Sequence, residues 1–146
     1  MSGFYDFKVY SVLETDEVLK LLQGEGAAGL LVISRTEDDT TELNTLTEKI
    51  LGAAGFAVHR DAYQLKTGTE KGFSLRGLQT GKDIKNVLVF GFKPAFLGLN
   101  WNLAEYRPFT RDEVNYLFAD NLQKLSEDKA LKGKLWSCLQ LMFPKE

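Results

Sequence analysis

Two short runs of apolar residues stand out because they do not alternate with polar ones. Leu30–Ile33 is apolar throughout, and five of the seven residues from Asn86 to Phe92 are apolar. A strand covered by helices on both faces of its sheet has this pattern, whereas a strand with one wet face alternates. We therefore predict that both runs are strands of a mostly parallel central sheet. Gly91 and Pro94 are expected to end the second strand.

Helical spacing of apolar residues predicts the elements that pack on this sheet. A short helix is expected from Thr15 to Gly24. A longer one over residues 41–54 would have an N-cap at Thr40 or Thr41. Its buried stripe is Leu43, Leu46, Ile50 and Leu51. Because Phe56–Val58 is predicted to begin the next strand, this region forms a β-α-β unit, in which the two strands are parallel and the crossover is right-handed. The fold class is therefore α/β.

The last third of the chain is predicted to hold a strand and two helices. Residues 114–119 are rich in strand formers. Asp120 or Asn121 would cap a short helix, and Ser126 or Asp128 would open the final one. Its apolar stripe is expected to consist of Leu131, Leu135, Trp136, Leu139, Met142 and Phe143. In this interpretation Trp136 anchors the final helix to the core.

Composition sets limits on the class of protein. A chain of 146 residues is about one domain, and 44% hydrophobic with 26% charged residues is ordinary for a globular protein. A formal net charge of −2 gives no global attraction to nucleic acid or to an anionic membrane. Cys138 is the only cysteine, which excludes an intramolecular disulfide and a thiolate zinc cluster. No apolar run reaches the roughly 18 residues of a membrane span, and Met1–Gly3 does not resemble the start of a signal peptide. A cytoplasmic protein is expected.

Two glycine-rich stretches resemble nucleotide-binding motifs in letters only. Residues 24–29 match the dinucleotide fingerprint, but a helix precedes them and a strand follows, which is the reverse of the required order. Residues 77–83 fall one residue short of a phosphate loop, and Asp83 replaces its magnesium-binding Ser or Thr. No cofactor is therefore expected.

Candidate catalytic and metal-binding residues are few. Glu37, Asp38 and Asp39 could hold a hard cation or could be a solvated loop that enters a helix. His59 and Asp61 could be a general base and its orienting group, but no suitable nucleophile accompanies them. We assign no catalytic residue and no metal site.

Aromatic residues gather in two places that suit binding to another protein. The N-terminal stretch, residues 1–13, is either an edge strand packed on its own domain or an arm for docking, and it contains Phe4, Tyr5, Phe7 and Tyr10. The loop after the second predicted strand, residues 95–103, contains Phe96, Leu97 and Trp101. It either covers one end of the core or binds a partner.

Residues 121–139 resemble the C-terminal region of the psi subunit of bacterial DNA polymerase III. In that family a short leucine helix leads through a polar turn to a helix with a basic residue, then Leu-Trp, then another apolar position. Lys132, Leu135, Trp136 and Leu139 stand at these places. The order of predicted elements is also similar, so that the resemblance covers residues 29–143. Residues 1–28 depart from the family's N-terminal pattern.

The resemblance implies a three-layer α/β/α sandwich, related in fold to uracil-DNA glycosylases but without their chemistry. It implies a non-catalytic accessory subunit of the replication machinery, with the clamp loader and a chi-like subunit as partners. Neither direct nucleic-acid binding nor membrane association is expected. Two alternatives remain open: an α/β interaction domain outside replication, and a glycosylase-like enzyme. The enzyme would use Asp38 or Asp39 as its water-activating residue, beside Phe92 or Trp101.

Overall fold

The chain folds around a five-stranded sheet in the computed structural model, which describes residues 15–68, 73–75, 79, 82–99 and 104–143. The strands are β2 Leu30–Arg35, β3 Ala62–Thr67, β4 Asn86–Phe90, β5 Phe109–Arg111 and β6 Val114–Ala119. The α-helices are α1 Thr15–Leu21, α2 Thr41–Ala53, α3 Val58–Asp61, α5 Leu122–Glu127 and α6 Lys129–Met142. Two short 3-10 helices, η1 Thr36–Asp38 and η2 Pro94–Leu97, follow β2 and β4.

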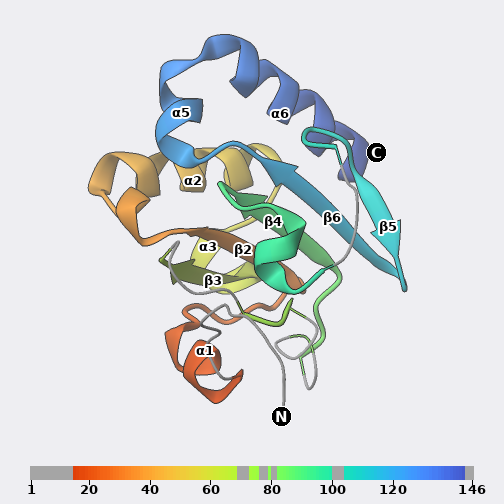
Figure 1. The fold of residues 1–146 in the computed structure, drawn as a ribbon. Helices are drawn as coiled ribbons and strands as arrows, with labels where there is room; N and C mark the ends of the chain where they lie inside the picture. The colour runs from red at the N-terminus through yellow and green to blue at the C-terminus, as the bar shows by residue number, and fades with distance from the viewer. Residues whose placement is uncertain (1–14, 69–72, 76–78, 80–81, 100–103, 144–146) are drawn as a thin grey trace.

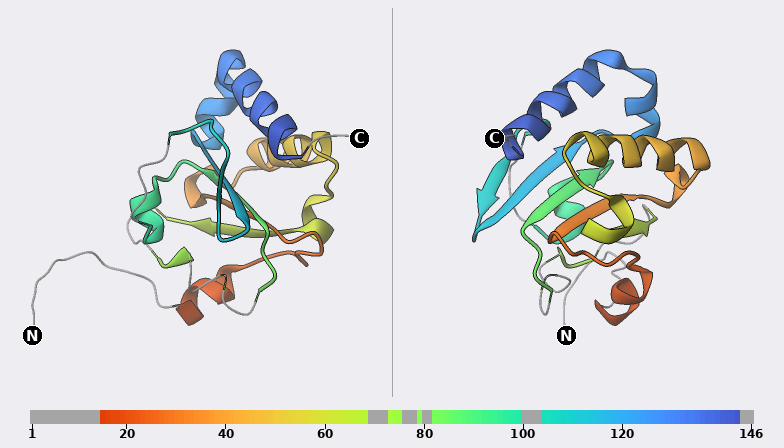
Figure 2. Two further views of the ribbon diagram at one scale, coloured as in Figure 1. Left: turned by 90° about the vertical axis from the view of Figure 1, so that its right-hand side faces the viewer. Right: turned by 180° about the vertical axis from the view of Figure 1, so that it is seen from behind.

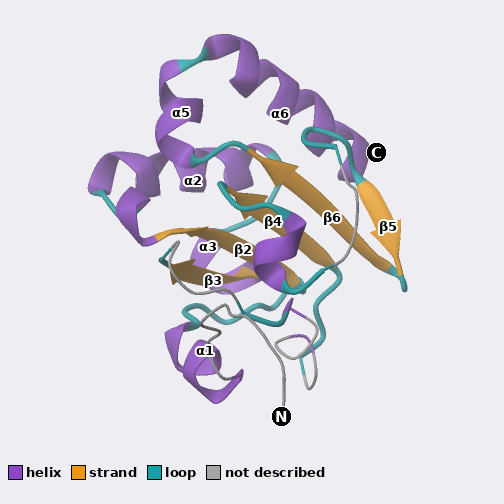
Figure 3. Cartoon of the chain, viewed as in Figure 1, coloured by secondary structure: helices purple, strands orange, loops and turns teal. Residues whose placement is uncertain are grey.

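The strand order is β3-β2-β4-β6-β5. The first four strands are parallel, and only β5, at one edge, runs antiparallel to its neighbour β6 (Figure 3). β2 and β4 are the two apolar runs of the sequence, and they lie side by side in register from Leu30 opposite Asn86 to Ile33 opposite Val89. The predicted α/β fold with a mostly parallel sheet is confirmed.

Successive residues of the strands contribute to two hydrophobic clusters, one on each face of the sheet. Leu31, Ile33, Val87 and Val89 belong to one cluster, which Val18 of α1 and Leu97 of η2 complete. The alternate residues of the same strands pack against α2, α5 and α6. Figure 1 shows these three helices above the sheet and α1 below it, and the side view in Figure 2 agrees. This double cover explains why neither run alternates.

The helix caps lie where the sequence predicts them. The Thr40 side chain accepts a hydrogen bond from the Leu43 N–H, and Asn121 does the same for Lys124. Asp128 accepts from the N–H groups of Ala130 and Leu131 at the start of α6. Each cap satisfies backbone donors that the first helical turn leaves unpaired.

The prediction of a strand over Phe56–Val58 is wrong. Val58 already belongs to the short helix α3, and β3 begins only at Ala62. The Asp61 carboxylate accepts a hydrogen bond from the Ala57 N–H at 2.8 Å, and this closes a helical turn. This hydrogen bond between residues four apart in the chain thus overrides the preference of Phe and Val for a strand.

The predicted role of Trp136 as an anchor in the core is also wrong. Trp136 is 41% exposed, whereas Leu135 and Leu139 are each 2% exposed. Cys138 is buried with these leucines, and its thiol donates a hydrogen bond to the Tyr106 carbonyl. Leu135, Cys138 and Leu139 are spaced at i, i+3 and i+4 and form the buried face of α6, whereas Trp136, about 100° around the helix from Leu135, lies outside it.

Glycines 24, 26 and 29 have a structural role. All three have positive φ, and a Cβ at Gly26 would lie 2.1 Å from the Tyr63 ring. The segment that they form lies against β3 and the end of α3, where Gln23 pairs with Gln64. Glycine is needed here for backbone conformation and close packing. Within the described residues, no helix is long and apolar enough to cross a membrane.

Candidate functional site

The carboxyl ends of β2 and β4 form the switch point of the sheet, because the chain leaves β2 toward β3 on one side and later returns to β4 on the other. Open α/β sheets commonly bind ligands at such a point. Arg35 lies here beside Gly91 and makes two hydrogen bonds, of 3.0 and 3.1 Å, to the buried Asp38 carboxylate. This pairing raises the pKa of Arg35, and both Asp38 oxygens are engaged.

The ring of Phe92 also has a structural partner. It stacks on Phe96 with ring centroids 4.6 Å apart, and it is buried. Asp38 and Phe92 are two of the residues that a glycosylase-like site would use. The geometry gives each of them a packing or charge-pairing role instead.

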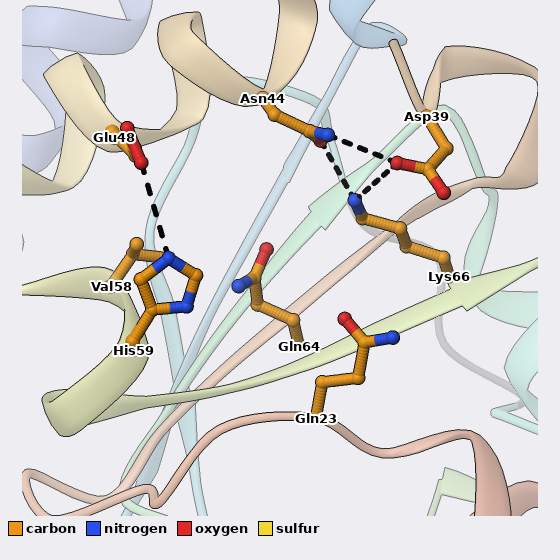
Figure 4. Close-up of a pocket in the computed structure, with 8 residues that line it drawn as sticks. All are labelled: Gln23, Asp39, Asn44, Glu48, Val58, His59, Gln64 and Lys66. Carbon is orange, nitrogen blue, oxygen red and sulfur yellow. Dashed lines mark hydrogen bonds and ion pairs between the residues drawn. The ribbon is translucent and has the colours of Figure 1, made fainter. Parts of the chain in front are cut away.

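A polar cleft lies between the start of α2 and the outer edge of β3 (Figure 4). Its volume is about 380 Å³, and it is lined by Gln23, Asp39, Asn44, Glu48, Val58, His59, Gln64 and Lys66. The Lys66 ammonium donates hydrogen bonds of 2.7 Å to Asp39 and to Asn44. The bond from Lys66 is the main reason that the pKa of Asp39 is lowered. The charged groups at this end of the cleft therefore satisfy one another.

His59 lines the other end of the cleft, but it has no catalytic pairing with Asp61. Its side chain is 81% exposed and lies 4.0 Å from a Glu48 oxygen. Asp61 is bound instead by the Arg60 guanidinium and the Ala57 N–H, and both lower its pKa. Among the residues that the structure describes, no group of three or more His, Cys, Asp or Glu side chains could hold a metal ion.

A second, apolar depression lies between α2 and α6, on the face of the sheet that α2, α5 and α6 cover. We call it the α2–α6 groove. It has a volume of about 230 Å³ and is lined by Leu46, Lys49, Ile50, Ala53, Leu125, Lys132, Leu135, Trp136 and Leu139. Leu125, Leu135 and Leu139 are buried, whereas Trp136 is 41% exposed.

The charged residues of the α2–α6 groove are both lysines. Lys49 lies on α2 and Lys132 on α6, and both are exposed. In the described part of the chain, neither ammonium has a carboxylate within ion-pair distance. The groove thus combines an apolar floor with two positive charges that no described carboxylate compensates.

The docking residues predicted from the sequence differ in burial, and several of them lie outside the described part of the chain. Leu97 is completely buried in the core cluster below the sheet, so it has no surface to offer a partner, and its predicted docking role is wrong. Phe96 is half-buried and packs on Phe73 and Phe92. Trp101 lies outside the described residues, as do four residues of the N-terminal stretch: Phe4, Tyr5, Phe7 and Tyr10.

The α2–α6 groove was not predicted from the sequence. Its α6 side carries a usable signal, since Lys132 and Trp136 are spaced by one helical turn on a face beside the buried stripe. Its α2 side requires the tertiary fold. The sequence matches no family model and no curated protein.

Proposed function

We propose that this chain is a non-catalytic subunit that binds another protein, and that it belongs to the DNA replication machinery, as the resemblance to the psi subunit implies. One observation carries the proposal. The four residues on which that resemblance rests, Lys132, Leu135, Trp136 and Leu139, all line the α2–α6 groove. A sequence pattern that recurs in a protein-binding family thus coincides with an apolar depression of this fold, in which Trp136 is the exposed apolar residue of the pattern.

The groove suits a protein better than a small molecule. Pockets for small ligands usually have volumes of about 300–1,000 Å³, and this depression, at about 230 Å³, is smaller. Trp136, one of the residues that line it, is 41% exposed. Tryptophan is among the residues most enriched in interaction hot spots, where it packs against apolar neighbours.

The polar groups elsewhere support a non-catalytic role. Asp38 is held by Arg35, and Asp39 by Lys66. Asp61 is bound by its own chain neighbours. A general base needs a free lone pair aimed at a substrate, and the observed pairings use these carboxylates to hold the fold. A cytoplasmic location would follow from a role in replication.

Affinity purification of the tagged chain from its source cells tests the proposal. We expect subunits of the replicative polymerase or its clamp loader to be enriched, as identified by mass spectrometry. Trp136→Ala should abolish the enrichment, because it removes the exposed aromatic side chain that lines the groove. Lys132→Glu, an exposed substitution with little effect on folding, should reduce it.

Leu141→Ala is the matched control. Leu141 is 74% exposed on the same helix but does not line the groove. This variant should retain the partner. Equal capture by all variants would overturn the groove as the binding surface. A partner that depends on Trp136 but has no part in replication would favour the alternative, an α/β interaction domain outside replication.

A further inference from the structure

We propose that the α2–α6 groove receives an acidic amphipathic helix of the partner protein, an inference that rests on the proposed protein-binding function. The groove lies between α2 and α6, and the half-buried Leu46 and Ile50 of α2 line it above the buried side chains of Leu125 of α5 and Leu139 of α6. A partner helix binds such a surface through apolar residues at positions i, i+3 or i+4, and i+7.

The charges around the groove specify the polar face of that helix. Lys49 and Lys132 come from the two different helices that form the groove. A helix lying on the apolar floor would present its flanking positions to both lysines. Carboxylates at these positions would form ion pairs there, whereas lysines or arginines would be repelled.

The sequence of α6 strengthens this charge argument. The helix contains Lys129, Lys132 and Lys134 but no Asp or Glu, although the whole chain has a net charge of −2. Lys129 and Lys132 lie at the start of the helix, near the positive end of its dipole, where cations are unfavourable. Residues that oppose a local folding preference without a compensating contact are typical of functional sites.

Lys134 differs from the two lysines of the groove. Its ammonium lies 5.9 Å from the centroid of the Tyr106 ring, and it does not line the groove. It therefore supplies a matched control with the same charge on the same helix. A partner that is attracted only by the overall charge of α6 would not distinguish Lys134 from Lys132.

A display library of random 16-residue peptides, selected on the full chain, tests the proposal. Peptides retained by the wild type but not by Trp136→Ala should share apolar residues at helical spacing, flanked by Asp or Glu. In fluorescence anisotropy, the double variant Lys49→Glu/Lys132→Glu should bind the selected peptide at least about tenfold more weakly. Lys134→Glu should bind it within about twofold of the wild type. Added salt should weaken the wild-type complex.

A charge swap provides the sharpest test. When the acidic residues of the selected peptide are replaced by lysine, binding to the wild type should be lost, and binding to Lys49→Glu/Lys132→Glu should be regained. Circular dichroism of each variant establishes that it is folded. Recovery by the swapped pair cannot result from a change in stability.

Three results would overturn the proposal. The first is a peptide consensus that is basic or uncharged. The second is a charge swap that restores nothing. The third is binding of a thirty-nucleotide oligothymidylate that requires Lys49 and Lys132 but not Trp136, which would show that the lysines bind nucleic acid. None of these results affects capture of replication proteins through Trp136, so the two proposals fail separately.

Discussion

Replacing Gly91 with alanine tests how the switch point of the sheet is packed. Gly91 follows β4 with φ of +90°, a conformation that costs an L-residue roughly 1–2 kcal/mol. A Cβ there would lie 2.9 Å from the Asn121 Cβ and 3.1 Å from the Arg35 Cδ. Asn121 caps α5 through a 2.8 Å hydrogen bond to the Lys124 N–H, and loss of such a cap costs about 1 kcal/mol. We expect Gly91→Ala to lower the free energy of unfolding by about 2–4 kcal/mol.

Two other glycines allow the cost of the positive φ to be measured apart from the cost of the close contacts. Gly55 has φ of +93°, but a Cβ added to it would meet no atom within 4 Å, so Gly55→Ala should cost only the conformational part, about 1–2 kcal/mol. Gly133 lies in α6 with open space around it and without a positive φ. Gly133→Ala should therefore stabilise the chain by about 1 kcal/mol through higher helix propensity.

Urea unfolding followed by far-ultraviolet circular dichroism measures all three variants. With a slope of about 2 kcal/mol per molar urea, the midpoint of Gly91→Ala should fall by roughly 1–2 M. Equal losses of unfolding free energy for Gly91→Ala and Gly55→Ala would show that Asn121 and Arg35 move away from the added methyl group without a cost in stability. An unchanged midpoint for Gly91→Ala would refute the whole account of this turn.

Three further predictions concern stability and reactivity. Leu135→Ala should lower the urea midpoint more than Trp136→Ala, although leucine is smaller, because only Leu135 is buried; the opposite order would place Trp136 in the core. Burial raises the pKa of the Cys138 thiol, so at pH 8 it should react with a disulfide reagent far more slowly than in the urea-unfolded chain, as followed by absorbance. The Arg60 guanidinium lowers the pKa of Asp61 below 3.8, so this carboxylate stabilises the fold above that pH, and the stabilisation is lost as the pH falls through its folded pKa. Asp61→Asn should therefore narrow the difference between urea midpoints at pH 7 and pH 3, and an unchanged difference would contradict the pairing.

The parts of the fold that were predicted correctly depend on local patterns. Leu30–Ile33 of β2 and Val87–Phe90 of β4 are buried and apolar without a break, because both faces of these strands are covered, and this is visible within a few residues. The caps at Thr40, Asn121 and Asp128 are equally local, since each side chain binds a backbone N–H two or three residues ahead. Such features need no knowledge of the distant chain.

The errors arise from side-chain contacts that the pattern of apolar residues does not show. Phe56 favours a strand by propensity, but its ring packs edge-on against Phe143 with centroids 4.9 Å apart, and Asp61 turns the following residues into a helix. Trp136 fits a broad apolar stripe on a helical wheel. The buried face of α6 instead extends from Leu135 toward Cys138, and this leaves Trp136 exposed. A helical pattern gives the direction of the buried face, but only the neighbouring helices determine how wide that face is.

The acidic run after β2 shows why the position of the candidate site also needed the structure. Glu37, Asp38 and Asp39 suggest a cation site when read as neighbours. Asp38 binds Arg35, three residues earlier, but the partner of Asp39 is Lys66, which lies 27 residues away in the sequence. Once this distant lysine is placed, the strand ends hold charge pairs that satisfy each other. The lysines of the α2–α6 groove have no such partners in the described chain, and a charge left uncompensated beside an apolar floor can be neutralised by a second molecule. The contrast between these two sets of charges is the physical reason for proposing that a partner binds at the α2–α6 groove, and that the charges at the ends of the strands hold the fold.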